Sequence, residues 1–279
     1  MPNLTSSNTY TSSTLVNDKF FWHPPLMLQC KMILMIVSLT MILLRKLLIL
    51  EKRTCSPSSF LSSIVPHSLM EPLLYTTILS WNIRGANNSK AKRQLKDMIR
   101  KYKPSFLAIY ETLVPFLRLS TFWNNNGYNP QHIIEANGHS GGIWLLKQSA
   151  KNTTSLIIDF NQYSITFTVS LGDATTTCTC VYASPNATMR TYLWTYLSKL
   201  NRTIAGPWML IGDFNETIIP SDQRGGIFNH TREALFSNFM AECNLLDLAI
   251  VSGRFTWHRN HNGLCIISKK LDRGIANIN

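Results

Sequence analysis

Polar side chains that could support hydrolytic chemistry follow the ends of several apolar segments. They are Asn82, Glu111, Tyr182, Asp213 and Asn215. If those segments are strands that end at one sheet edge, the five side chains emerge into a shared cleft. Hydrolysis of a phosphodiester uses a hard divalent cation on oxygen ligands, an acceptor for the proton of the attacking water and donors for the developing charge. This set offers all three kinds of group, although each residue alone is also typical of a solvent-facing strand end.

Two of these positions are the most specific. Glu111 directly follows an apolar strand-like run, where an unpaired carboxylate is costly. Residues 208–212 form an apolar run that ends in glycine and presents Asp213 and Asn215 two residues apart. Asp213 could orient the attacking water or accept its proton, and Asn215 could donate to a phosphate oxygen. Asp and Asn also favour ordinary turns, so this segment alone leaves both interpretations open.

From residue 76 onward the pattern predicts alternating strands and helices, which is typical of a layered α/β domain. Strands are predicted at 76–81, 106–110, 142–146, 155–160, 164–170, 176–182 and 208–212, and helices at 90–102, 188–200 and 231–243. In the first helix the expected buried stripe is Leu95, Met98, Ile99 and Tyr102. In the last helix it is Leu235, Phe236, Phe239, Met240 and Cys243.

The composition favours a folded domain with a polyanionic partner. The 279 residues are 45% hydrophobic, and 27 Lys and Arg against 15 Asp and Glu give a net charge of +12. The helix at 90–102 and the residue after it contain seven basic residues and only one acidic residue. This excess of positive charge indicates either a solvated outer face or a nucleic-acid contact. The six cysteines lack the CxxC spacing of a zinc site, and we expect Cys178 and Cys180 to be buried on one strand face.

Residues 1–75 differ from the rest of the chain, and we expect a non-homologous, poorly ordered leader. Its apolar run at 32–44 has 13 residues, about 20 Å as a helix against about 30 Å of membrane hydrocarbon. Extension to residue 50 adds Arg45 and Lys46, each costing about 3 kcal/mol near the bilayer centre. Membrane association through residues 32–50 is therefore the less favoured alternative.

Eight short motifs occur in the order found in one protein family. They are WNIRG (81–85), YET (110–112), SGGIW (140–144), VYASP (181–185), GDFN (212–215), RGG (224–226), FTW (255–257) and LDR (271–273). Over residues 76–279 the chain thereby resembles the endonuclease of plant LINE-type (non-LTR) retrotransposons, within the endonuclease/exonuclease/phosphatase superfamily. Relatives that cleave phosphoinositides or sphingolipids are a third possibility, which the basic charge and the RGG and FTW motifs disfavour.

The resemblance implies a DNase I-like α/β fold, a four-layer sandwich of two facing β-sheets flanked by helices. It also implies a monomeric, Mg²⁺- or Mn²⁺-dependent hydrolase that nicks DNA in the nucleus or cytoplasm. The implied metal ligands are Glu111 and Asn82, the implied catalytic residues are Asp213, Asn215, Tyr182 and Asp272, and the implied substrate-binding residues are Arg84, Arg224 and Trp257.

One implied partner is missing from the printed sequence. Asp272 matches the carboxylate that holds a catalytic histidine, and in the family that histidine follows some dozens of residues later, whereas this chain ends at Asn279. We therefore expect a C-terminally truncated domain that lacks this histidine and a closing strand, with impaired or absent activity. The alternative is a non-catalytic retroelement remnant with weak affinity for nucleic acid.

Overall fold

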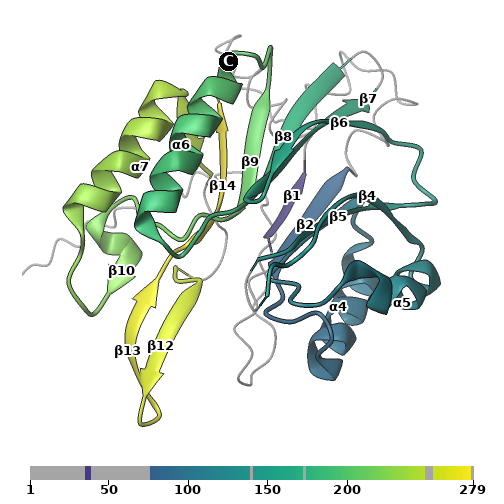
Figure 1. Cartoon of the computed structure of the whole chain (residues 1–279), viewed down its shortest axis with the longest axis horizontal. Coiled ribbons are helices and arrows are strands. Elements are labelled where there is room, and N and C mark those ends of the chain that lie inside the picture. The colour runs from purple at the N-terminus through teal and green to yellow at the C-terminus, as the bar shows by residue number, and fades with distance from the viewer. Residues whose placement is uncertain (1–34, 39–75, 139–140, 172–173, 249–253, 278–279) are drawn as a thin grey trace, which may run out of the picture.

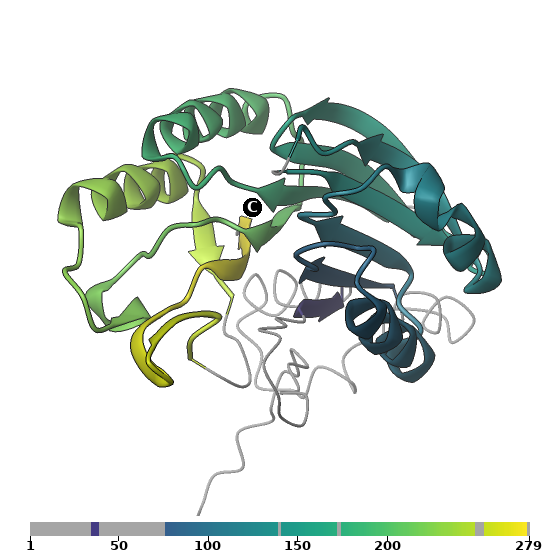
Figure 2. The same cartoon turned by 60° about the horizontal axis from the view of Figure 1, so that its bottom comes forward.

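The computed structural model describes residues 35–38, 76–138, 141–171, 174–248 and 254–277, with backbone only for residues 35–38. Two large β-sheets face each other, and helices cover the outer face of each (Figure 1). Figure 2 shows the two groups of helices on opposite sides of the paired sheets. The expected four-layer α/β sandwich is confirmed.

The first sheet has the strand order β1-β2-β3-β5-β4. Its strands are β1 Met35–Ser38, β2 Thr77–Asn82, β3 Phe106–Tyr110, β4 Tyr128–Ile134 and β5 Ile143–Gln148. β2 and β3 run parallel, with Asn82 opposite Tyr110, while the other pairs are antiparallel. The carboxyl ends of β2 and β3 therefore meet at one edge, and Glu111 follows directly after β3.

The second sheet has the order β11-β14-β9-β8-β7-β6. Its strands are β6 Thr154–Asn161, β7 Ser164–Leu171, β8 Ala174–Tyr182, β9 Trp208–Asp213, β11 Leu245–Asp247 and β14 Asp272–Asn277. β8 and β9 are parallel and pair Tyr182 with Asp213, whereas β14 is antiparallel and pairs Asp272 with Asp213. Tyr182, Asp213 and Asp272 therefore lie side by side on neighbouring strands at the same edge of this sheet.

A small third sheet extends from the sandwich next to that edge (Figure 1). It has the order β10-β13-β12, with β10 Gln223–Arg224, β12 Trp257–His261 and β13 Leu264–Lys269. The 3₁₀ helix η2 Pro220–Asp222 leads into it.

Helices α4 Ser89–Tyr102 and α5 Ser120–Asn125, with the 3₁₀ helix η1 Phe116–Leu119, lie beside the first sheet. Helices α6 Ala187–Asn201 and α7 His230–Glu242 cover the second (Figure 1). Asn88 and Asn186 cap α4 and α6, and each side-chain oxygen accepts hydrogen bonds from the first helical N–H groups.

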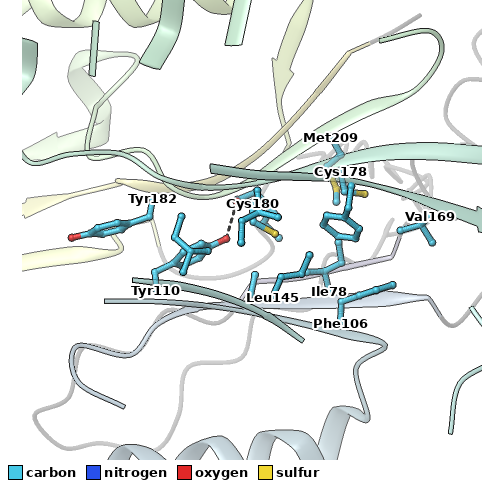
Figure 3. Packing of buried hydrophobic residues seen from close by; sticks show 14 of the residues in the cluster. Ile78, Phe106, Tyr110, Leu145, Val169, Cys178, Cys180, Tyr182 and Met209 are labelled. Carbon is cyan, nitrogen blue, oxygen red and sulfur yellow. Dashed lines mark hydrogen bonds between the residues drawn. The ribbon is translucent and has the colours of Figure 1, made fainter. Parts of the chain in front are cut away.

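The main core lies between the two large sheets. Ile78 and Phe106 from the first sheet pack with Phe167 and Met209 from the second, and the ring centroids of Phe106 and Phe167 lie 5.2 Å apart. Figure 3 shows Ile78 and Phe106 on one side of this layer and Met209 on the other. Cys178 and Cys180 are fully buried in this layer, as their alternation predicts. Burial of apolar surface on both sides of each sheet stabilises the sandwich and fixes the strand ends that carry the polar residues.

The sequence predicts seven strands and the three long helices within a few residues, but it misses several elements. Strand β4, helix α5 and strands β11 to β14 have no clear apolar periodicity; β12, for example, reads Trp-His-Arg-Asn-His. One stripe residue is wrong: Leu235 is 43% exposed, whereas Phe236, Phe239, Met240 and Cys243 are buried. Leu235 lies at the margin of the face of α7 that packs in the core, so its side chain is exposed to solvent.

The expected leader contributes one strand to the domain. β1 pairs antiparallel with β2, from Met35 opposite Ser80 to Ser38 opposite Thr77. The edge of β2 that faces away from β3 is therefore occupied by residues upstream of the expected boundary at 76. The other residues of the apolar segment 32–50 lie outside the described residues. In the part of the chain that is described, no helix is long and apolar enough to cross a membrane.

Candidate active site

The side chain of Asn82 connects the two sheets at the edge where the polar residues gather. Its Nδ2 donates to Glu111 Oε1 at 2.8 Å and to Asp213 Oδ2 at 3.1 Å, and Asn82 is buried. Its carbonyl oxygen, Oδ1, is also buried but has no hydrogen-bond partner among the described residues. A buried oxygen without a donor is costly, so this atom points to a cation or another ligand group at the site.

Glu111 is held in an uncommon backbone conformation. Its φ is 50°, in the left-handed region that non-glycine residues rarely adopt. Its carbonyl accepts from Gly85 N at 2.8 Å, and its Oε1 also accepts from the hydroxyl of Tyr182 at 3.0 Å. Both hydrogen bonds to the carboxylate within the described chain reach Oε1, so Oε2 is available to a cation.

The turn after β9 positions Asp213 and Asn215. The backbone N–H of Asn215 donates to Asp213 Oδ1 at 2.9 Å, and Asn215 also has a left-handed φ of 50°. Asn215 Nδ2 donates to Ala183 O at 2.8 Å, which ties this turn to the segment that follows Tyr182. An amide has two N–H donors, so the second hydrogen of Nδ2 can still reach a phosphate oxygen.

The two buried aspartates of the site interact electrostatically. Burial raises the pKa of Asp213 to about 6, while hydrogen bonds from Asn215 and Asn82 act in the opposite direction. Burial, and then the charge of Asp213, raise the pKa of Asp272 well above its ordinary value. Asp272 N donates to Thr256 Oγ1 at 3.0 Å. A carboxylate that titrates near neutral pH is suited to proton transfer.

Arg84 lies on the loop between β2 and α4, beside Glu111. It is exposed and has a φ of 49°. Its positive charge acts to lower the pKa values of Asp213, Asp272 and Tyr182, although burial outweighs it at each. The loop thus presents a cation to the same carboxylates, where an anionic substrate would also arrive.

Arg224 and Trp257 lie on the small sheet rather than within this hydrogen-bonded group. Both flank β13: Arg224 pairs with Ser268, and Trp257 pairs with Lys269. Thr256, next to Trp257, links the small sheet to Asp272. Of the nine expected site residues, the structure therefore brings six together. Arg84 lies at the margin of these six, and Arg224 and Trp257 lie on the neighbouring small sheet.

Arg190 is a site-supporting residue that the residue pattern alone does not single out. It is 2% exposed; its Nη1 donates to Ser184 O and Pro185 O at 2.8 and 2.9 Å, and its Nη2 donates to Glu216 Oε2 at 2.8 Å. It therefore joins the segment after Tyr182 to the segment after Asn215. A charged residue on the buried side of a predicted amphipathic helix would have been the signal for it.

The site suits a hard cation with few protein oxygen ligands, such as Mg²⁺ or Mn²⁺, better than a softer metal held by several His or Cys side chains. Within the described ranges, no three His, Cys, Asp or Glu side chains form a group able to hold a metal ion. Mg²⁺ usually takes only one or two carboxylates and retains several waters. Glu111 fits that requirement, as does Oδ1 of Asn82, which has no hydrogen-bond partner among the residues that the structure describes.

Fold and site together define a class of protein. The chain belongs to the endonuclease/exonuclease/phosphatase family, whose sequence profile matches residues 79–266. A comparison with curated protein sequences finds no match.

Solved structures with the same fold include three nucleic-acid enzymes. The endonuclease domain of TRAS1, a telomere-specific non-LTR retrotransposon, has a TM-score of 0.56 and 12% identity, over 72% of this chain and 84% of that chain. The AP endonuclease LMAP from Leishmania major has a TM-score of 0.57 and 16% identity, over 84% and 90%. A variant of the 3′ phosphatase NExo from Neisseria, bound to a product DNA hairpin, has a TM-score of 0.52 and 13% identity, over 72% and 86%. At these identities the likeness shows the fold.

Proposed function

We propose that this chain is a metal-dependent phosphodiesterase domain of the type that nicks DNA in LINE-type retrotransposon endonucleases, with impaired activity. The observation that carries the proposal is the Asn82 bridge between Glu111 and Asp213, in which Oδ1 of Asn82 is buried and has no hydrogen-bond partner in the described part of the chain. An ordinary structural amide would satisfy both ends of its side chain. The TRAS1 neighbour and the ordered sequence motifs support the retrotransposon type.

In this proposal Glu111 and Asn82 hold Mg²⁺ or Mn²⁺. The tyrosine hydroxyl and the amide that donate to Glu111 and Asp213 keep the carboxylates oriented toward the same space. A bound divalent cation would neutralise charge on the phosphate and on the leaving oxygen. The left-handed backbone of Glu111 is consistent with a functional constraint, since strained residues concentrate at such sites.

Asp213 orients the attacking water and accepts its proton, for which a pKa of about 6 is suitable. Asn215 donates its second amide hydrogen to a phosphate oxygen, and Tyr182 contacts the same phosphate. Asp272 supports proton transfer from its position beside Asp213. These four side chains come from β8, β9 and β14 or the residues just after them, so one sheet edge positions the whole reacting group.

The substrate class follows from charge. Before residue 76 the chain has six of its 27 basic and three of its 15 acidic residues, so residues 76–279 have a net charge of +9. Arg84 beside the carboxylates, with Arg224 and Trp257 on the small sheet, would contact the backbone and bases of DNA. The NExo structure with a DNA hairpin is the neighbour consistent with this partner. We propose a monomer for the same domain, residues 76–279.

A plasmid-nicking assay tests the proposal. The purified chain is incubated with supercoiled DNA and Mg²⁺, with EDTA, and as the near-isosteric variant Asp213→Asn. Loss of a catalytic base typically lowers the rate by about 10² to 10⁴. Glu242→Gln removes the same charge from an exposed position on α7 and is the matched control.

Two outcomes distinguish the two functions, and a third excludes the site. Nicking that requires Mg²⁺ and is lost only in Asp213→Asn supports the enzyme. Duplex binding without nicking in any protein supports the alternative, a non-catalytic remnant that binds nucleic acid. Nicking that is equal in Asp213→Asn and in the parent would exclude this site as its source.

A further inference from the structure

Helix α4 carries a continuous basic row on the side that faces away from the sheet. Its buried side consists of Ala91, Leu95, Met98 and Ile99, which pack in the cluster on the outer face of the first sheet. On the opposite side, basic residues recur every three or four positions and are exposed: Lys90, Arg93, Lys96, Arg100 and Lys103. Residues three and four apart on a helix are neighbours, so these side chains form one row.

The charge of this row is not balanced within the helix. Asp97 is the only acidic residue of α4, and it forms an ion pair with Arg100. Like charges at these spacings destabilise a helix. The arrangement is therefore unfavourable for stability alone, and a bound polyanion would offset the repulsion.

The row begins next to the candidate active site. Only six residues separate Asn82 from Ser89, the first residue of α4. The connecting loop is fixed, because Gly85 N donates to Glu111 O and Ala86 N donates to Thr112 O, both at 2.8 Å. The basic row thus starts near Glu111 and follows α4, the helix that lies on the outside of the first sheet (Figure 1).

We infer that the exposed face of α4 is a phosphate-contacting surface that extends the nucleic-acid footprint beyond the active site. This inference rests on the proposed DNA partner. The 14 residues of α4 span about 21 Å, which corresponds to roughly six base pairs of duplex. Because a regular row of flexible cations meets backbone phosphates and no base edges, the surface adds affinity without sequence preference.

A nucleic acid fits this face better than a membrane does. Basic helices that bind membranes insert an apolar face below the headgroups. The apolar face of α4 is already buried against the sheet, with Leu95 1% exposed and Ala91 4% exposed. Only the charged side is available to a partner.

The test compares two double variants of the full chain that remove the same charge. Arg93→Gln with Lys96→Gln neutralises the middle of the row, and Lys199→Gln with Arg202→Gln neutralises two exposed residues at the end of α6. Glutamine keeps helix propensity close to that of Lys and Arg, so the fold is retained. Fluorescence anisotropy measures affinity for duplexes of about 10 and about 20 base pairs over a range of salt concentrations.

For the α4 variant on the longer duplex, we expect the slope of log association constant against log salt concentration to be less negative by about 2. Binding near 0.1 M salt should be roughly tenfold weaker than that of the parent. The α6 variant should match the parent, and the α4 variant should lose much less on the shorter duplex. Equal slopes for the two variants would overturn the inference while leaving the proposed function in place. Failure of the parent chain to bind duplex would overturn both, and binding to anionic phospholipid vesicles that depends on α4 would assign the face to a membrane instead.

Discussion

Nη2 of Arg190 lies 2.8 Å from Oε2 of Glu216, with side chains 2% and 6% exposed. Glu216 also accepts from Arg232 Nε at 3.0 Å. This buried pair joins two segments that carry candidate catalytic residues, one following Tyr182 and one following Asn215. Its contribution therefore lies in geometry as well as in stability.

Removal of one partner of this pair should strongly destabilise the chain. Arg190→Met leaves a buried carboxylate with only one cation, and such losses cost about 3 to 5 kcal/mol. Urea unfolding followed by circular dichroism measures the change. The double variant Arg190→Met with Glu216→Leu should recover most of the stability, because neither buried charge of the pair remains and Arg232, which loses its contact with Glu216, is 35% exposed.

The matched control is the exposed pair of Arg202 and Glu242, 3.4 Å apart. Arg202→Met should cost less than about 1 kcal/mol, because exposed ion pairs contribute little. If Arg190→Met were as mild as this control, the pair would have no structural importance. If the double variant were no more stable than Arg190→Met, the loss would come from the carbonyl contacts of Arg190 and not from charge.

The sequence predicts the fold well where apolar residues form a continuous run, as in β3, or recur at helical spacing, as in α4. β3 has the predicted bounds of 106–110, and α4 begins one residue before its predicted start. The ordered motifs also select the six residues that gather at the sheet edge. Each of these residues lies at one end of a strand or just beyond it, and the directions of the strands bring those ends together. Strand direction thus explains why these six predicted site residues lie together.

The remainder depends on long-range partners that have no local signature. β14 contains Asp272 and Arg273 and still lies inside the sheet, because Arg273 pairs with Asp222, 51 residues earlier. Likewise, the pairing of β1 with β2 joins residues about 40 positions apart. Charged strands and distant edge strands are stabilised by contacts that a local apolar pattern does not encode.

Glu111→Gln should weaken divalent-metal binding by at least about tenfold, because it replaces a charged oxygen ligand by a neutral amide. Isothermal titration of the full chain with Mn²⁺ measures the affinity without any need for turnover. Glu242→Gln, at an exposed position on α7, is the control and should leave affinity unchanged. Equal affinity in all three proteins would mean that the metal binds elsewhere.

Gly212→Ala should destabilise the chain by about 3 kcal/mol. Gly212 has a φ of 147°, and a Cβ there would lie 1.9 Å from Val181 O on the neighbouring strand β8. The parallel pairing that brings Tyr182 opposite Asp213 requires this close approach. Gly138→Ala is the control, since its φ is 62° and no atom of the described residues lies within 4 Å of the added Cβ.

The control should cost only about 1 to 2 kcal/mol from the left-handed backbone. Chemical denaturation of both variants gives the comparison. Equal losses would show that backbone conformation, and not the contact with Val181, determines the cost at Gly212.

Tyr110→Phe should reduce stability at neutral pH by about 1 to 3 kcal/mol. The hydroxyl of Tyr110 joins the two sheets: it donates to Ile211 O at 3.0 Å and accepts from Ser80 Oγ at 3.2 Å (Figure 3 shows the ring between the sheets). Phenylalanine leaves both groups buried without this partner. Tyr192→Phe, at a residue that is 65% exposed, should change stability by less than about 0.5 kcal/mol.

The same variant should reveal a pH dependence with a defined sign. Burial raises the pKa of Tyr110 well above its ordinary value of 10. The folded state therefore favours the neutral phenol, so this contribution to stability is fully present below pH 10 and is lost as pH rises above it. The other tyrosines are common to both proteins and cancel in the difference. We expect the stability gap between the parent and Tyr110→Phe, measured by urea unfolding, to be constant from pH 7 to about pH 9 and to shrink above pH 10; a gap that widens there would mean that the folded state favours the ionised phenol.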